Sequence, residues 1–496
     1  MNNLILAIDQ GTGGTKTVLF ETDGGVVAKA AVPLQSHYPQ VGFVEQDPGE
    51  LYENVLASVR LCIDNAVQQD RNVSNRIAAA GVSNQRETFL LWDKAGAPLC
   101  RAVVWQCKRA VPICERLKGT SVEAEIRART GLIIDPYFSG AKLAWLMEND
   151  PVVKEAVHSG KAFFGTVDTW LLYRLTDGDS YFTDYTNASR TLLFNIHTLD
   201  WDEILLNAFG AAGLVLPKAA PSSFHYGASD FEGLFPKPIP ITGMIGDSHA
   251  AAFGEGCFHP GEAKATLGTG SSILCNIGPV PSASDHGMVT TICWSTVERI
   301  DYALEGIIVT CGATVKWLRD QLGLIASSAE TESMARAVES NGGVYFIPAF
   351  SGMGAPHWKM DARASIVGLT FGSDKNHVIR AALESVAFQV KDVIVAMEKD
   401  SGVSLSELKV DGGMTGNRFL MQLIADLLGV KAVNIGLEEV SALGAAYMAG
   451  LGVGKFKSIN DLASLHYSQN VFEPSQAAGQ IQEDYDAWQA MIAKHC

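Results

Sequence analysis

Residues 5–16 of this 496-residue chain read Ile-Leu-Ala-Ile-Asp-Gln-Gly-Thr-Gly-Gly-Thr-Lys. The apolar run predicts a strand that ends at Asp9, and the turn of glycines and threonines leads into a second apolar strand at residues 17–20. Such a hairpin directs backbone N–H groups and small hydroxyls into one space, which suits phosphate oxygens. Asp9, at the strand end, is placed to hold Mg²⁺ or its waters. An ordinary tight turn has the same pattern, so this stretch alone leaves both interpretations open.

Two further turns of this kind follow. Residues 266–272 read Thr-Leu-Gly-Thr-Gly-Ser-Ser ahead of an apolar strand, and residues 408–417 read Leu-Lys-Val-Asp-Gly-Gly-Met-Thr-Gly-Asn at a predicted strand-to-helix junction. The paired glycines of the last turn let a planar ring lie close to the backbone. Three such turns in this order resemble the actin, hexokinase and sugar-kinase ATPase superfamily. The resemblance implies an α/β fold of two actin-like, ribonuclease H-like ATPase domains, with ATP in the cleft between them.

The composition excludes several classes of protein. The 38 Lys and Arg against 54 Asp and Glu give a net charge of −16, which argues against a nucleic-acid partner. No apolar run approaches the roughly 20 residues of a membrane span, and the start lacks the basic region of a secretory signal. The nine cysteines are scattered without a Cys-x-x-Cys pair, which favours reduced thiols. We expect a cytoplasmic protein with no membrane insertion.

Strand-like and helix-like segments alternate along the chain, which is typical of α/β folds. Residues 77–83 predict a buried strand and residues 89–92 its neighbour. Apolar residues at three- and four-residue steps predict a helix over 376–402, with Asn376 as its cap. A second helix is predicted over 419–428.

The best domain boundary lies near residues 246–260, where glycines interrupt the chain between the halves that carry the turns. We therefore expect two domains of similar topology, residues 1–250 and 251–496.

Further motifs narrow the resemblance. They include Ser-Asn-Gln-Arg-Glu-Thr at 83–88, Val-Trp-Gln-Cys at 104–107, Asp-Pro-Tyr-Phe-Ser-Gly at 135–140, and segments 165–170, 183–190, 348–356 and 441–446. In order and over nearly the whole chain, they are similar to motifs of the carbohydrate kinases that include glycerol, xylulose and gluconate kinases, and most of all to glycerol kinases. The resemblance implies ATP- and Mg²⁺-dependent phosphorylation of a terminal hydroxyl of a small polyol, with glycerol as the first candidate, by a homodimer or homotetramer.

The pair Arg86-Glu87 suits a polyol, because neighbouring hydroxyls need both donors and an acceptor. A surface ion pair is the alternative. The resemblance adds Trp105 and Tyr137 to the substrate pocket as a flat wall and a further hydroxyl contact. Without the resemblance, both aromatics would be assigned to the core.

Asp247 is the candidate catalytic base, because the attacking hydroxyl must lose its proton and a carboxylate within hydrogen-bond reach can accept it. It can also cap a helix, since small and helix-forming residues follow it. Together with Asp9 it is the expected ligand set for the metal.

The nucleotide contacts follow from the three turns and the resemblance. The β- and γ-phosphates are expected at Thr12, Gly13, Lys16, Gly268 and Thr269, and the adenosine at Gly413, Met414 and Asn417, with Gly312 and Lys316 opposite. Many N–H groups, one cation and Mg²⁺ suffice, because phosphoryl transfer is mostly positioning and charge neutralisation.

Two expected substrate contacts, Ser248 and Ser272, depart from the family pattern. Glycerol kinases commonly have glutamine and an aromatic residue at these places. The smaller serines would enlarge the substrate end and make it more polar, which fits a four- or five-carbon polyol or ketose such as erythritol or xylulose. Repacking of neighbouring side chains would instead keep glycerol as the substrate, and both readings stay open here.

A third interpretation is an actin-like nucleotide switch without a small-molecule substrate. The combination of Arg86, Glu87 and Tyr137 argues against it, since a filament has no need of a polyol site.

Overall fold

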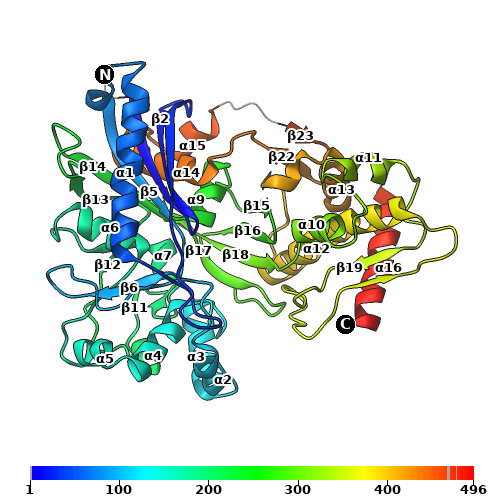
Figure 1. The fold of residues 1–496 in the computed structure, drawn as a ribbon, viewed down its shortest axis with the longest axis horizontal. Helices are drawn as coiled ribbons and strands as arrows, with labels where there is room; N and C mark the ends of the chain where they lie inside the picture. Colours follow the sequence, from blue (N-terminus) through cyan, green and yellow to red (C-terminus); the bar gives the residue numbers. More distant parts are fainter. Residues whose placement is uncertain (1–2, 466–469, 476–477) are drawn as a thin grey trace.

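The computed structural model describes residues 3–465, 470–475 and 478–496 (Figure 1). Strands and helices alternate along the chain, as the sequence predicts. No helix in these ranges combines the length and apolarity needed to cross a membrane.

A six-stranded sheet holds the first turn. Its order is β13-β14-β5-β1-β2-β3, with β1 antiparallel to β2 and parallel to β5. The strands are β1 (Leu4–Gln10), β2 (Gly14–Glu21), β3 (Val26–Pro33), β5 (Ile77–Asn84), β13 (Ser223–Ser229) and β14 (Ile239–Gly246). The predicted hairpin of residues 5–20 and the predicted strand of residues 77–83 are confirmed.

A seven-stranded sheet holds the other two turns. Its order is β17-β18-β16-β15-β21-β22-β23, with β15 antiparallel to β16 and parallel to β21. The strands are β15 (Glu262–Leu267), β16 (Ser271–Gly278), β17 (Val289–Ser295), β18 (Ile300–Ile308), β21 (Glu407–Asp411), β22 (Lys431–Asn434) and β23 (Asn470–Phe472). Each sheet thus has a central hairpin whose first strand pairs in parallel with a later strand, so the two sheets share one topology.

Helices cover both sheets, and α10, α12, α13 and α16 surround the second one on the right of Figure 1. The α-helices are α1 (Pro48–Val67), α2 (Val111–Leu117), α3 (Ser121–Thr130), α4 (Ser139–Asn149), α5 (Pro151–His158), α6 (Val167–Leu175), α7 (Tyr185–Ala188), α8 (Glu203–Ala208), α9 (Asp247–Gly254), α10 (Gly312–Asp320), α11 (Glu330–Arg336), α12 (Lys375–Ser401), α13 (Arg418–Leu428), α14 (Val440–Gly452), α15 (Ile459–Ala463) and α16 (Ala478–His495). Two 3₁₀ turns, η1 (Val73–Arg76) and η2 (Gly413–Gly416), and the short strands β4 (Glu45–Gln46), β6 (Phe89–Trp92), β7 (Ala102–Val103), β8 (Phe163–Thr166), β9 (Phe182–Asp184), β10 (Phe194–Asn195), β11 (Asp200–Trp201), β12 (Lys218–Ala220), β19 (Tyr345–Ile347) and β20 (Ser365–Val367) complete the set.

Two local predictions were wrong. Strand β6 does not pair with β5; it joins a separate four-stranded sheet of order β4-β7-β6-β8. The link between them contains Glu87 at φ 61°, which turns the chain away from the first sheet. The cap of α12 is Asp374, whose side chain accepts the N–H groups of Asn376 and His377; Asn376 cannot cap the helix because it already lies in the first helical turn.

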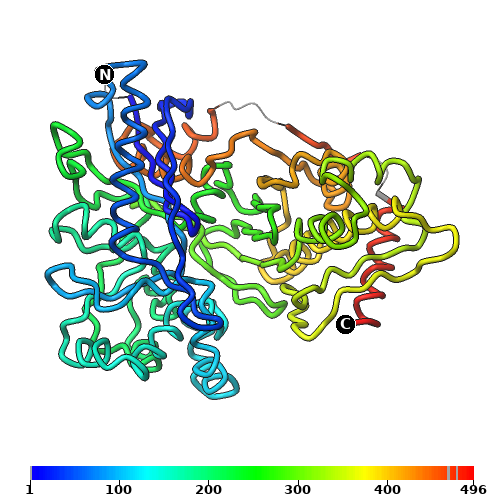
Figure 2. Tube along the Cα trace, viewed as in Figure 1, coloured from blue at the N-terminus to red at the C-terminus, as the bar shows by residue number. Residues whose placement is uncertain are grey.

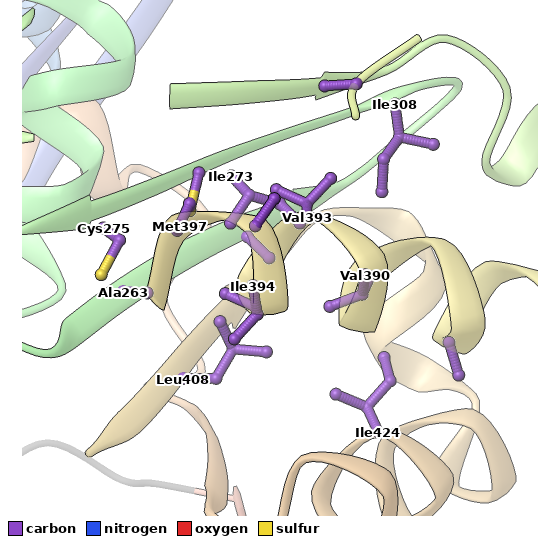
Figure 3. Close-up of a cluster of buried hydrophobic side chains, with 14 of the residues drawn as sticks. Ala263, Ile273, Cys275, Ile308, Val390, Val393, Ile394, Met397, Leu408 and Ile424 are labelled. Atoms are coloured by element: carbon purple, nitrogen blue, oxygen red, sulfur yellow. The ribbon is translucent and has the colours of Figure 1, made fainter. Parts of the chain in front are cut away.

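The largest core lies between α12 and the second sheet. Figure 3 shows Val393, Ile394 and Met397 of α12 gathered with Ile273 and Leu408 of the strands. All five side chains are buried, at 3% exposure or less. Apolar residues at three- and four-residue steps along α12 produce this contact, as the sequence pattern predicts.

Helix α14 belongs to the second half of the chain but packs on β1, β5 and β14 of the first sheet, where its orange trace lies beside blue strands (Figure 2). It also crosses α9, the helix that follows the first sheet. Glycines make the approach possible: a Cβ atom at Gly444 would overlap the backbone of Ala250, and one at Gly81 would overlap the carbonyl of Ala445. The two sheets are therefore joined through a tightly packed helix pair.

This contact predicts the effect of Gly444→Ala. Helix propensity alone would favour alanine by about 1 kcal/mol. The overlap with Ala250 forces the helices apart, so we expect a net loss of about 1–3 kcal/mol in the free energy of unfolding, measured by urea denaturation. The control is Gly372→Ala, because the nearest atom to a Cβ there is Thr370 Oγ1 at 3.7 Å, and its effect should stay within about 0.5 kcal/mol. Equal stability of the two variants would contradict the packing argument.

Candidate active site

One cavity of about 390 Å³ brings residues of both halves together. Six residues that the sequence singled out line it: Asp9, Lys16, Arg86, Asp247, Ser248 and Ser272. The remaining lining residues are Ala251, Lys264, Thr266, Gly270, Asp411, Glu438, Glu439, Val440 and Ser441. We refer to it as the reaction cavity.

Asp9 ends strand β1 inside this cavity, where Ser83 Oγ donates to its carboxylate at 3.1 Å. Burial, and then the charge of Asp247, raise the pKa of Asp9 to about 7. Two carboxylates that repel each other in this way fit a shared cation. Mg²⁺ is commonly held by one or two carboxylates together with waters and substrate phosphates, so this pair is sufficient for it.

Asp247 is the first residue of α9, and Gly246 takes the cap position, so the interpretation of Asp247 as a helix cap was wrong. Its side chain is 37% exposed and Arg86 Nε lies 3.3 Å from its Oδ1. The Ser248 N–H donates to the same oxygen at 2.7 Å. The carboxylate is thus held at one oxygen and open to the cavity, which is the arrangement a general base needs.

Arg86 belongs to a buried charge network that reaches away from the cavity. Its Nη2 donates to Glu305 Oε1 at 2.9 Å, and Glu305 Oε2 lies 2.6 Å from Arg190 Nη1. Arg190 Nε in turn donates to Glu87 Oε1 at 2.6 Å. All four side chains are at most 6% exposed, so Arg86 and Glu87 do not form a surface ion pair.

Burial and the neighbouring guanidiniums act in opposite directions on the pKa values of Glu305 and Glu87. Burial alone would raise the pKa of Glu305, but Arg190 and Arg86 hold it well below its usual range. Burial raises the pKa of Glu87, and the two guanidiniums offset part of this rise. The Arg86 Nη1 atom is buried without a hydrogen-bond partner among the described residues, which leaves a donor for a substrate hydroxyl.

Sequence reasoning missed Glu305 and Arg190 as site residues. Glu305 is a carboxylate inside the mostly apolar segment 302–308 of β18, and that exception to the pattern was the available signal. Arg190 closes the motif at 183–190, but nothing local to it indicates that it contacts Glu305.

The predicted aromatic wall lies next to the first turn. Trp105 Nε1 donates to Thr12 Oγ1 at 2.9 Å, and the rings of Trp105 and Tyr137 meet edge to face at 5.5 Å. Tyr137 also lies 5.9 Å from the Arg190 guanidinium, measured to the ring centre. The Thr12 hydroxyl is therefore engaged with the wall, whereas Gly13 is exposed with open space around it.

A second cavity, of about 790 Å³, collects the rest of the predicted nucleotide contacts. Its lining includes Gly268, Thr269, Gly312, Lys316, Gly413, Met414 and Asn417. A Cβ at Gly312 would lie 2.6 Å from the Gly268 carbonyl oxygen, and one at Gly412 would lie 2.6 Å from that of Leu267, so glycine is required for these close approaches. The volume falls in the range of small-molecule pockets. This glycine-lined cavity therefore fits a nucleotide.

The turn between β15 and β16 connects the two cavities. Leu267 to Thr269 line the glycine-lined cavity, and Thr266 and Gly270 line the reaction cavity. A nucleotide bound in the first would therefore direct its phosphates along this turn toward the second.

Three predicted residues have partners that the sequence could not indicate. Lys16 forms an ion pair of 3.0 Å with Glu439, which precedes α14. The hydroxyls of Ser248 and Ser272 lie 3.3 Å apart, and Ser272 Oγ donates to Glu305 Oε1 at 3.2 Å. The two serines form a polar wall on one side of the reaction cavity, and the buried Glu305, which accepts from Ser272, does not line it.

Comparison with known proteins identifies the family. The N-terminal domain of the FGGY family of carbohydrate kinases matches residues 4–254, and its C-terminal domain matches residues 263–453. The chain is 45% identical over 491 residues to glycerol kinase 2 of Thermotoga maritima, covering 99% of this chain and 98% of that protein. It is 45% identical over 493 residues to the glycerol kinase of Desulfitobacterium hafniense, covering 99% of both.

Solved structures agree with the sequence comparison. The Plasmodium falciparum glycerol kinase with ADP superposes with a TM-score of 0.93 at 34% identity, covering 99% of this chain and 98% of that one. A ligand-bound xylulose kinase from Lactobacillus acidophilus shares the fold, with a TM-score of 0.87 at 22% identity over 99% of this chain and 98% of that one. These likenesses confirm the predicted fold class, two actin-like α/β domains. The chain belongs to the FGGY family of carbohydrate kinases.

Proposed function

We propose that the protein transfers the γ-phosphoryl group of ATP to a terminal hydroxyl of a small polyol, and that glycerol is this polyol. The observation that carries the proposal is the reaction cavity, where Asp247 stands open beside Arg86 and next to Asp9. The glycerol kinases among its relatives support glycerol as the substrate.

Asp247 acts as the base in this reaction. The oxygen of the substrate hydroxyl forms a bond to the γ-phosphorus while the bond to the β-phosphate oxygen of ADP breaks, and ADP leaves with that electron pair. The hydroxyl proton passes to the Asp247 carboxylate. Arg86 Nε lies 3.3 Å from this carboxylate and holds it in place, and the Arg86 Nη1 donor is available to a second hydroxyl of the polyol.

Asp9 and Asp247 would hold Mg²⁺, directly or through its waters. When bound, the ion neutralises charge on the phosphate oxygens. The nucleotide itself binds in the glycine-lined cavity, with Gly413, Met414 and Asn417 at the adenosine and Gly312 and Lys316 opposite. The β- and γ-phosphates contact Gly268 and Thr269 of this cavity and Thr12, Gly13 and Lys16 of the first turn.

The polyol lies between Arg86, Glu87, Trp105 and Tyr137.

We also propose that residues 1–250 and 251–496 act as the two domains of a cytoplasmic homodimer or homotetramer. Size-exclusion chromatography with light scattering measures the assembly directly.

A second candidate substrate, a four- or five-carbon polyol or ketose, is favoured by one observation. The polar wall formed by the Ser248 and Ser272 hydroxyls would meet additional oxygens of a longer substrate. A coupled assay of ADP release with glycerol, erythritol, xylitol, ribitol, D-xylulose and dihydroxyacetone separates the candidates. ATP hydrolysis that does not rise with any of them would support a nucleotide switch instead.

Asp247→Asn should keep nucleotide and polyol binding but lower kcat by about 10²–10⁴-fold, because the amide cannot accept the proton. Steady-state kinetics and calorimetric titration with the polyol measure the two effects. The matched control is Asp461→Asn, since that residue only caps local backbone at the surface. Turnover within threefold of the wild type would refute the assignment of Asp247 as the base.

Ser272→Phe should shift preference toward glycerol, because a phenyl ring replaces the polar wall and fills space. We expect kcat/KM for erythritol or xylitol to fall at least about tenfold more than kcat/KM for glycerol. Ser271→Ala serves as the control: Ser271 is the neighbouring residue on β16, so its side chain points to the opposite face of the sheet. A uniform loss on all substrates would show that Ser272 does not determine substrate length.

A further inference from the structure

Lys264 is a buried lysine in the wall of the reaction cavity. It lies on β15 and is 1% exposed. Its Nζ donates to Ser248 Oγ at 2.9 Å and to Thr266 Oγ1 at 2.8 Å. Lysine is almost never fully buried unless its charge is compensated, so the identity of its partner matters.

No carboxylate of the described residues pairs directly with the charge of Lys264. No ion pair of Lys264 shorter than 4.0 Å occurs in the part of the chain that the structure describes, and both hydrogen-bond acceptors are neutral hydroxyls. Thr266 Oγ1 in turn donates a hydrogen bond to Asp411 Oδ2 at 3.1 Å. Burial and then the charge of Asp411 raise the pKa of the neighbouring Glu255 well above its usual value, and the charge of Lys264 offsets part of this rise. The Lys264 ammonium, whose hydrogen-bond acceptors are both neutral, can therefore bind an anion.

Lys16, the cation expected from the sequence, is already engaged. It pairs with Glu439 at 3.0 Å and its side chain is 48% exposed. The cavity that holds Asp9 and Asp247 therefore has Lys264 as its buried cation without a direct carboxylate partner, within the described residues.

We propose that Lys264 binds the phosphoryl group that is transferred. This inference rests on the proposed function and adds a residue to it. An ammonium has three N–H donors, and two are taken by Ser248 and Thr266, which leaves one for a phosphate oxygen. Ser248 follows Asp247 directly, so the charge lies beside the base.

Its role in the reaction is electrostatic. While the hydroxyl oxygen bonds to the γ-phosphorus and the bond to ADP breaks, negative charge is spread over the three remaining oxygens of the phosphoryl group. A fixed ammonium in a site with little water stabilises that charge more than solvent would. No proton or electron leaves Lys264 in this step.

Lys409 provides a matched control. It is the register partner of Lys264 on the adjacent strand β21 and is 9% exposed. It differs by having a direct partner, Glu407, at 2.7 Å, and it does not line either cavity. Lys409→Met therefore removes a buried lysine from the same sheet without touching the proposed phosphate contact.

The test compares two nucleotides by calorimetric titration with Mg²⁺ and without polyol. In Lys264→Met we expect the affinity for the ATP analogue AMP-PNP to fall at least tenfold and the affinity for ADP to stay within twofold, since only the former carries a γ-phosphate. We expect kcat to fall by about 10²–10³-fold. Lys264→Arg should recover part of the AMP-PNP affinity, and Lys409→Met should leave both affinities unchanged.

A structural role would give a different result. Equal losses for ADP and AMP-PNP, or no loss for either, would overturn the proposal. Because Lys264→Met alone removes a positive charge that offsets the buried Glu255 and can unfold the site, the double variant Glu255→Gln/Lys264→Met is measured in parallel and should show the same selective loss. The titrations need no polyol turnover, so a wrong polyol substrate would leave their outcome unaffected.

Discussion

The buried charge network of Arg86, Glu87, Arg190 and Glu305 is the constraint on which the site depends. Each charge withdrawn from water is destabilising by several kcal/mol unless it is paired with good geometry. Here two guanidiniums and two carboxylates alternate at 2.6–2.9 Å, so every charge has an opposite neighbour. Three of the residues come from the first half of the chain and Glu305 comes from β18 of the second sheet. The same contacts that neutralise the charges therefore hold the two halves in one arrangement around the reaction cavity.

Local chemistry explains which parts could be predicted from the sequence. The two hairpins and the turn before α13 depend on glycines, on a strand-ending aspartate and on the cap Asn417, all within a few residues of one another. Five of the seven nucleotide contacts that line the glycine-lined cavity lie in such turns, whereas Gly312 and Lys316, in the first part of α10, could be named only with the family resemblance. Helix α12 could be predicted because its apolar residues repeat with the helical period.

Long-range contacts explain what could not be predicted. Glu305 is separated from Arg86 by 219 positions, and Lys16 from Glu439 by 423, so no local pattern relates the members of either pair. Strand β6 follows β5 closely in the chain, yet Glu87 between them adopts a backbone conformation that non-glycine residues seldom take. Lys16 could be named from its position in the first turn, but its ion pair with Glu439 could not be predicted, and Lys264 looks like an ordinary strand residue in the sequence.

The position of α14 affects how the chain can fold as it is made. The first sheet is complete in sequence at Gly246, but the helix that covers β1, β5 and β14 ends at Gly452. Synthesis at about 5–20 residues per second leaves roughly 10–40 s between the two points. During that interval the face of the first sheet that α14 covers in the folded chain, with Gly81 on it, has no partner helix. Folding of the N-terminal half is therefore completed only after most of the C-terminal half has emerged from the ribosome.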